Sequence, residues 1–101
     1  MLSEAHLRDL RAYHRALGDV TRMRIVQLLA TAGERSASEI QEHLHVSQPL
    51  LSWHLRRLRR AGLVSTTRTG REVRCMLDRA RFAELHERGF RTLMNPAQAT
   101  A

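Results

Sequence analysis

The strongest constraint on the fold comes from one stretch, residues 47–64, with the sequence SQPLLSWHLRRLRRAGLV. We expect most of it to form a helix, in which Leu51, Leu55 and Leu58 follow the spacing i, i+4, i+7 and form an apolar stripe that must be buried. The remaining face offers side chains that can bond bases and phosphates, namely Gln48, Ser52, Trp53, Arg56, Arg57 and Arg60. A helix held by one face, with Gln, Ser and Arg on the other, is suited to the major groove of DNA.

Positive charge is concentrated next to this helix. The chain of 101 residues has a net charge of +7, and all 17 basic residues are arginine. The segment 56–74 alone carries +6, because Glu72 is its one acid and it holds Arg56, Arg57, Arg59, Arg60, Arg68, Arg71 and Arg74. Such a patch predicts a polyanionic partner, and we favour nucleic acid. A membrane surface is disfavoured, because these arginines lie on a patterned helix and a hairpin, not on a broad basic amphipathic helix.

The length and the cysteine count narrow the class of protein. A chain of this size forms one domain with a modest core, too small for a large catalytic cleft. The single Cys75 excludes an internal disulfide and fits a reducing compartment; as a side chain it is either a buried small hydrophobe or an oxidant sensor. No apolar run could span a bilayer, and residues 1–12 are too charged for a signal peptide, so we expect a cytoplasmic protein.

Hydrophobic periodicity and capping residues predict four helices before residue 62. The first covers residues 3–16, with an apolar stripe through Leu7, Leu10, His14 and Leu17. The expected caps and stops of the others are Asp19 and Gly33 for the second, the capping box Ser36–Glu39 for the third, and Ser47 and Gly62 for the fourth. With a turn at residues 45–46, the third and fourth helices form a helix-turn-helix.

After Gly62 the pattern changes from helix to strand. Residues 63–68 and 72–77 are rich in β-formers and are joined by a Gly70 turn, which predicts a two-stranded hairpin, the wing of a winged helix. Asp78 is then expected to cap a last helix with Phe82, Leu85, Phe90 and Leu93 on one face. The predicted fold is therefore mainly α (α+β): a winged helix-turn-helix of about five helices and a hairpin, with one domain over 1–94 and a flexible tail over 95–101.

Three separated motifs resemble the ArsR/SmtB family of bacterial winged helix-turn-helix repressors. They are ALGDVTRMRIVQLL at 16–29, SQPLLSWHL at 47–55 and LRRAGLV at 58–64, and the resemblance covers roughly residues 10–78. Val20 stands where the family usually has a proline. The resemblance implies a homodimer that binds an imperfect inverted repeat in DNA, with the first and last helices at the dimer interface. The apolar stripes on both terminal helices agree with a dimer, because a three-helix core cannot cover them all.

Within the recognition helix we assign different contacts to different residues. Gln48, at its start, is placed to bond adenine, and Ser52 to bond a base or a phosphate. Ser47 is either a DNA contact or a plain helix cap, and the two roles can coexist. Trp53 packs either on sugar and thymine methyl groups or back onto the wing. His54 lies beside the apolar stripe, which favours packing, although the resemblance implies a place near the DNA.

The arginines are expected to contact the DNA backbone. Arg56 and Arg57 are assigned to phosphates, whereas Arg59 and Arg60 have a solvated alternative. At the wing tip, Arg68 and Arg71 suit minor-groove insertion or a phosphate contact, against the alternative of a solvated turn. Glu72 is expected to pair with either Arg71 or Arg74.

The chain departs from the metal sites of the family that it resembles. The Cys-x-Cys pair found in many members at the start of the third helix is Ser36-Ala37-Ser38 here, which excludes a soft-metal site of that type. Of a second, zinc-type site in the last helix, only Asp78 remains. A weaker hypothesis places Ni²⁺, Co²⁺ or Zn²⁺ between His6 or His14 and His86 across a dimer interface; the alternative is interface histidines bonded to water or backbone.

These observations favour a sequence-specific DNA-binding transcriptional regulator that acts as a homodimer, with a metal or ligand response left open. The alternative is a DNA-binding subunit whose signal is sensed by a separate protein partner. An enzyme is disfavoured, because the sequence has no nucleophile elbow, no glycine-rich phosphate loop and no paired carboxylates in an apolar setting.

Overall fold

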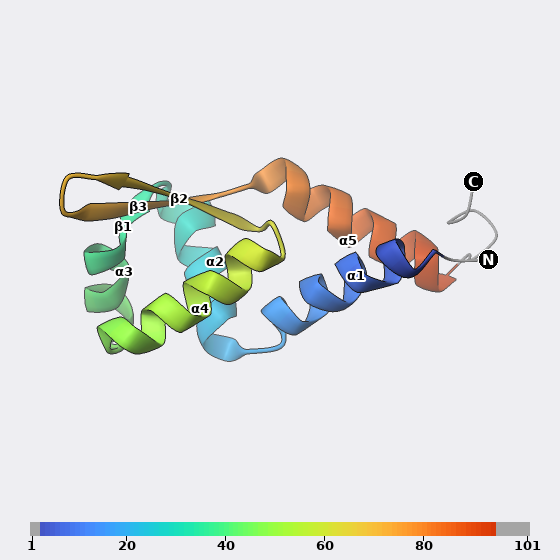
Figure 1. Ribbon diagram of the computed structural model, residues 1–101, viewed down its shortest axis with the longest axis horizontal. Coiled ribbons are helices and arrows are strands. Elements are labelled where there is room, and N and C mark those ends of the chain that lie inside the picture. The colour runs from blue at the N-terminus through green and yellow to red at the C-terminus, as the bar shows by residue number, and fades with distance from the viewer. Residues whose placement is uncertain (1–2, 95–101) are drawn as a thin grey trace.

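The fold is a winged helix-turn-helix flanked by two terminal helices (Figure 1). The computed structural model describes residues 3–94, so the predicted tail over 95–101 lies outside the described residues. In chain order the elements are α1 (Glu4–Leu17), α2 (Val20–Ala32), β1 (Arg35–Ser36), α3 (Ala37–Leu44), α4 (Gln48–Arg60), β2 (Val64–Thr69), β3 (Glu72–Leu77) and α5 (Arg79–Met94).

Side-chain caps fix where the helices begin, as the sequence predicts. The Asp19 carboxylate accepts the N–H of Arg22 at 3.1 Å, and the Ser47 hydroxyl accepts the N–H of Leu50 at 3.3 Å. Asp78 caps α5 in the same way. At the start of α3 the full capping box predicted from residues 36–39 is present. The boundaries of the helix-turn-helix therefore follow from local chemistry.

The wing is larger than predicted by one short strand. β2 and β3 form the expected antiparallel hairpin, with Val64 opposite Leu77 and Thr69 opposite Glu72. The expectation of a two-stranded sheet is corrected by β1, which pairs with β3 and gives the order β1-β3-β2. A two-residue strand has no periodicity to detect in the sequence, and its pairing with β3 is a long-range contact. This pairing ties the base of the wing to the start of α3.

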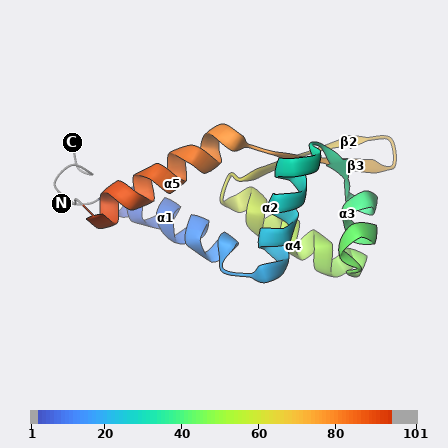
Figure 2. The ribbon, with the colours of Figure 1, turned by 180° about the vertical axis from the view of Figure 1, so that it is seen from behind.

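The core lies beneath the recognition helix. The stripe of Leu51, Leu55 and Leu58 on α4 is buried, as predicted, and packs with Ile25 of α2 and Ile40 of α3. Seen from behind, α2 crosses the middle of the molecule between α3 and the terminal helices (Figure 2). Because its apolar face is fixed in this core, α4 must present its polar face outward.

The terminal helices α1 and α5 lie side by side at the end of the molecule away from the wing (Figures 1 and 2). Their predicted apolar stripes are partly wrong. α1 buries Leu10, Tyr13 and Ala16, whereas Leu7 and His14 are exposed. α5 buries Leu85, Gly89 and Thr92. Each helix carries two apolar faces, and periodicity alone did not show which of them packs within one chain.

The second apolar face of the terminal helices remains open in the single chain. Phe90, Leu93 and Met94 on α5 are 65 %, 64 % and 65 % exposed, and Leu7 on α1 is also exposed. Large apolar side chains grouped at one end of a molecule mark an interaction surface.

Candidate nucleic-acid interface

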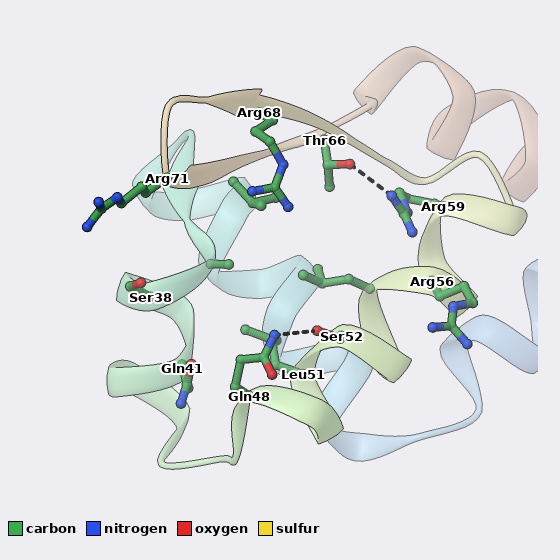
Figure 3. A pocket seen from close by; sticks show the side chains of 13 residues that line it. Ser38, Gln41, Gln48, Leu51, Ser52, Arg56, Arg59, Thr66, Arg68 and Arg71 are labelled. Carbon is green, nitrogen blue, oxygen red and sulfur yellow. Dashed lines mark hydrogen bonds between the residues drawn. The ribbon is translucent and has the colours of Figure 1, made fainter.

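A hollow of about 380 Å³ lies between α3, α4 and the wing (Figure 3). Its walls carry polar and basic side chains from all three elements, over a floor formed by Leu51, Leu55 and Val73. The other lining residues are Ala37, Ser38, Gln41, Gln48, Ser52, Arg56, Arg59, Thr66, Arg68 and Arg71. Of the residues that the structure describes, four arginines and no acid line this hollow, so it is suited to an anionic ligand that reaches both the helix and the wing.

The first turn of α4 presents the side chains assigned to bases. Gln48 is exposed, and its amide nitrogen donates a hydrogen bond to the Ser52 hydroxyl at 3.2 Å, one turn later (Figure 3). This bond orients the Gln48 amide along the outer face of the helix, where both its donor and its acceptor can meet a base edge. The Ser47 hydroxyl accepts the Leu50 N–H, which gives it the cap role left open by the sequence.

The arginines of the hollow take different directions. Arg68 extends from β2 toward the hollow, whereas Arg71 points outward from the tip of the wing (Figure 3). Arg59 donates to the Thr66 hydroxyl at 3.1 Å and so joins α4 to β2. Arg56 is exposed on α4. Within residues 3–94, no ion pair with a carboxylate is formed by Arg56, Arg68 or Arg71.

Arg74, which the sequence counted in the same basic patch, has a different environment. Its guanidinium lies 3.6 Å from a Glu34 carboxylate oxygen, 3.3 Å from Glu39 and 3.9 Å from Glu72. The choice left open for Glu72 is thereby settled in favour of Arg74. Within segment 56–74, the arginines without a carboxylate partner among the described residues therefore lie on α4 and in the outer part of the wing.

Trp53 lies on the side of α4 away from the hollow. The residue is 41 % exposed, and the guanidinium groups of Arg57 and Arg22 lie 5.0 Å and 5.3 Å from the centroid of its ring. Packing onto the wing, one of the two expectations, is therefore wrong. The stacking instead fixes the orientation of Arg57, whose planar guanidinium keeps its N–H groups free for a phosphate.

His54 belongs to the core and not to the outer face of α4. It is 4 % exposed, and Arg22 Nη1 donates to its Nδ1 at 3.0 Å. Burial lowers the pKa of His54, and the charge of Arg22 adds to this, against the opposing attraction of Asp19. The assignment of His54 as a DNA contact is thereby corrected, because the stripe that buries Leu51 and Leu58 also buries the imidazole.

Arg22 is a central residue that the sequence analysis did not single out. It is 8 % exposed, and its guanidinium donates to the carbonyl of Ala16 at 2.7 Å and to that of Arg15 at 3.1 Å. It thus satisfies carbonyls at the end of α1 while its own N–H is capped by Asp19. Burial opposes ionisation of Asp19, but the N–H and charge of Arg22 and the charge of His54 bring its pKa below the usual value. In the sequence, the only indication of this role of Arg22 was the motif LGDVTR, which ends with it.

The histidines proposed as metal ligands are not gathered within one chain. Among the described residues, no three His, Cys, Asp or Glu side chains form a group that could hold a metal ion. His86 Nδ1 lies 3.5 Å from the Tyr13 hydroxyl, and His6 lies next to the Ser3 hydroxyl at the start of α1. Burial raises the pKa of Tyr13. A site with His14 that is shared between two copies of the chain stays a prediction.

Cys75 does not provide a soft-metal ligand or a reactive thiol. It is fully buried on β3, and burial raises the pKa of its thiol, so the neutral form is favoured. The packing role, one of its two expected roles, fits this environment. A thiolate site for a soft metal does not fit these residues, since the chain has one cysteine and it faces the core.

Most of the region that builds the hollow lies in a segment that matches a known family. Residues 19–66 match the family described as "Bacterial regulatory protein, arsR family", and this segment covers α2, β1, α3, α4 and the first half of β2. A crystal structure titled "Possible transcriptional regulator for arsenical resistance" is 32 % identical, with a TM-score of 0.66 over 88 % of this chain and 95 % of that one. The chain belongs to the arsR family.

This arsR-family chain is also similar to a repressor in sequence and to a homodimeric domain in structure. A probable mercury resistance operon repressor from Streptomyces lividans is 40 % identical over 73 residues, which are 72 % of this chain and 58 % of that repressor. The chain therefore spans little more than half the length of this relative. The homodimeric winged helix-turn-helix domain of a possible ArsR-family regulator from Mycobacterium bovis aligns with a TM-score of 0.73 at 27 % identity, over 85 % of this chain and 82 % of that one. No described helix is long and apolar enough to cross a membrane.

Proposed function

We propose that this arsR-family chain is a transcriptional repressor that binds an inverted-repeat operator as a homodimer, through α4 and the wing. The observation that carries the proposal is the hollow, where Gln48 and Ser52 lie between basic side chains that form no ion pair with a carboxylate of residues 3–94. In this mode Gln48 and Ser52 contact base edges, and Arg56, Arg57, Arg68 and Arg71 contact phosphates. The core beneath α4 holds these groups on a rigid element.

The homodimer part of the proposal rests on the terminal helices. α1 and α5 lie at the end of the molecule away from the wing, and their side chains Leu7, Phe90, Leu93 and Met94 are exposed. A two-fold axis at this end would bury them and would leave both recognition helices free to enter successive major grooves, about 34–36 Å apart. The M. bovis relative described as homodimeric supports this mode of assembly.

The proposal is tested by fluorescence anisotropy with a labelled duplex from the region upstream of the chain's own gene and with a random duplex. If each subunit contacts four phosphates, the logarithm of the affinity should fall against the logarithm of salt with a slope near about −7 for the dimer. Tight binding that prefers the upstream duplex is expected. Equal affinity for both duplexes would contradict sequence-specific recognition.

Substitutions separate base contacts from phosphate contacts. Gln48→Ala should reduce the preference for the upstream duplex over the random one and leave the salt slope nearly unchanged, because Gln48 is uncharged. Arg57→Ala should weaken both duplexes about equally and flatten the slope. If Gln48→Ala left the preference untouched, the assignment of Gln48 to a base would be wrong.

The effector is tested in the same assay with Ni²⁺, Co²⁺, Zn²⁺ and a chelator. A change in affinity of tenfold or more, about 1.4 kcal/mol of coupling, would support a metal sensor, and His86→Ala should then abolish it. An affinity that ignores every metal would favour the alternative, in which another ligand or a separate protein partner provides the signal.

A further inference from the structure

A second basic surface lies outside the hollow, between α1 and the C-terminal half of α4. Arg8, Arg11 and Arg15 of α1 and Arg57 and Arg60 of α4 line a shallow concavity of about 160 Å³. Its other lining residues are Ala12 and Ala16. Five guanidinium groups thus surround two small apolar residues, and no acid of the described part of the chain takes part in the lining. We call these five arginines the α1–α4 arginine surface.

The acidic side chains of α1 do not neutralise this surface. Asp9 lies on the side of α1 that faces α5, where its carboxylate is 3.7 Å from Arg81 and 3.4 Å from Arg88. Arg8 and Arg11 are exposed, and within residues 3–94 they form no ion pair. Of the two acids of α1, Asp9 is thus paired to α5, and Glu4 in the first turn forms no ion pair within residues 3–94, while the arginines gather toward α4.

Helix stability does not account for all of these arginines. Arg15, Arg57 and Arg60 lie in or near the last turns of their helices, where a cation interacts favourably with the negative end of the helix dipole. Arg8 and Arg11 lie in the first half and the middle of α1, where this benefit is absent. Their placement beside three other cations adds repulsion, which a bound anion would relieve.

The surface is continuous with the DNA-binding face proposed above. Arg57, which is assigned to a phosphate above, lines the α1–α4 arginine surface, and Arg56, which lines the hollow, precedes it on α4. Arg8 and Arg15 are about 10.5 Å apart along the axis of α1, whereas successive phosphates of one DNA strand are about 3.4 Å apart along the duplex axis. The three arginines of α1 can therefore face several consecutive phosphates, and the small side chains of Ala12 and Ala16 leave room for close approach.

We propose that the α1–α4 arginine surface binds the phosphate backbone of duplex DNA, next to the segment that α4 and the wing contact. The inference rests on the proposed function, since it extends the DNA interface onto a helix outside the helix-turn-helix. The contacts are to phosphates, so they add affinity and salt dependence without sequence preference.

The test is the salt dependence of binding of the Arg8→Ala/Arg11→Ala variant to a random duplex. Loss of two phosphate contacts per chain should reduce the log–log salt slope by about 2 per chain, or about 4 for a dimer. Arg8→Lys/Arg11→Lys, which keeps both charges, should retain the wild-type slope. Arg24→Ala is the matched control, because Arg24 is exposed on α2, lines neither basic surface and should leave the slope unchanged. Thermal unfolding of each variant confirms that the fold is retained.

A wild-type slope in the Arg8→Ala/Arg11→Ala variant would overturn the inference. So would loss of binding to phosphatidylglycerol vesicles with no change in DNA binding, because the surface would then recognise lipid phosphate. Neither outcome would contradict the proposed function, because that function is tested separately by the effects of Arg57→Ala and Gln48→Ala on DNA binding. If the wild-type chain bound no duplex at all, the proposed function would fail, and this inference with it.

Discussion

Two groups of arginines in this protein differ in whether carboxylates lie next to them. One group is on β3 and α5, and the other is on α4 and at the wing tip. On β3, Arg74 lies within 4 Å of three carboxylates, and on α5, Arg81 and Arg88 pair with Asp9 and Glu84. On α4 and at the wing tip, Arg56, Arg68 and Arg71 have no such partner within the described residues. We call the two groups the paired arginines and the open arginines.

The difference teaches that net charge alone does not locate the interface. The segment 56–74 has the highest positive charge in the sequence, yet one of its arginines, Arg74, holds the base of the wing to residues of the β1–α3 region. Conversely, Arg8 and Arg11 lie outside that segment and are open. Removal of a paired arginine should therefore lower stability, and removal of an open arginine should lower the salt dependence of DNA binding. The following predictions test this division, from the largest expected effect to the smallest.

Arg22→Met should produce the largest loss of stability. Arg22 is buried, and its guanidinium donates to two backbone carbonyls at the end of α1 and to His54. Methionine removes the donor to the Ala16 carbonyl and to His54, whereas the Arg15 carbonyl keeps the N–H of Gly18. The loss of these buried bonds should lower the free energy of unfolding by about 3 kcal/mol. Urea denaturation followed by circular dichroism measures this. Arg22→Lys should recover only part of the loss, because one ammonium cannot replace the planar fork. A loss below about 1 kcal/mol would contradict the central role of Arg22.

Arg71→Ala and Arg74→Ala compare an open arginine with a paired one on neighbouring positions of the wing. Arg71→Ala should reduce the salt slope of DNA binding by about 0.9 per chain and change stability by less than about 0.5 kcal/mol. Arg74→Ala should leave the slope unchanged and lower stability by up to about 1 kcal/mol, because Glu34, Glu39 and Glu72 would lose their shared cation. Anisotropy titrations at several salt concentrations and urea denaturation measure both quantities for each variant. A loss of stability in Arg71→Ala together with a reduced salt slope in Arg74→Ala would contradict the division into open and paired arginines.

The sequence predicts the fold well wherever local chemistry decides it. Caps at Asp19, Ser36, Ser47 and Asp78 are confirmed, and the buried stripe of α4 follows from its spacing. These features depend on residues a few positions apart, so a single sequence contains the information.

The features that the sequence did not predict depend on tertiary contacts. β1 is a strand because it pairs with β3. Arg22 of α2 and His54 of α4 are hydrogen-bonded although they are 32 positions apart in the sequence. The face that α1 packs against α5 includes Tyr13, which the predicted stripe omitted. His14, which the stripe contained, lies near Gly89 of α5 but is exposed. For the candidate site, residue types on α4 indicated which side chains we assign to DNA, but only the ion pairs of the structure distinguish the paired Arg74 from the unpaired Arg71.

Ser36→Ala and Ser47→Ala apply the same comparison to two helix caps. The Ser36 hydroxyl is buried and accepts the Glu39 N–H at 3.1 Å, and the Ser36 N–H, followed by its hydroxyl, lowers the pKa of Glu39. Either substitution should cost about 1 kcal/mol of stability through loss of a cap. Only Ser47→Ala should also weaken DNA binding, because Ser47 is exposed at the start of the recognition helix. Equal DNA affinities for the two variants would limit Ser47 to its cap role.

The smallest expected effect is a pH dependence of stability that comes from His54. Burial, reinforced by Arg22, lowers the pKa of this imidazole in the folded chain, so the unfolded chain binds the proton more tightly. Stability should therefore be unaffected by His54 above its unfolded pKa, near about 6.5, and should decrease as the pH falls below that value. His54→Gln, which has an acceptor for Arg22 but no titrating group, should remove this part of the pH dependence.

The measurement is urea denaturation of the wild type and of His54→Gln between pH 5 and pH 8. Subtraction of the two curves cancels the other five histidines and the carboxylates, including Asp19, to the extent that their pKa values do not respond to the substitution. The wild type should lose more stability than the variant on the acid side, and the difference should be flat above neutral pH. A difference of the opposite sign would mean that the attraction of Asp19 exceeds the combined effect of burial and Arg22, and that His54 is charged in its site next to the open face of α4.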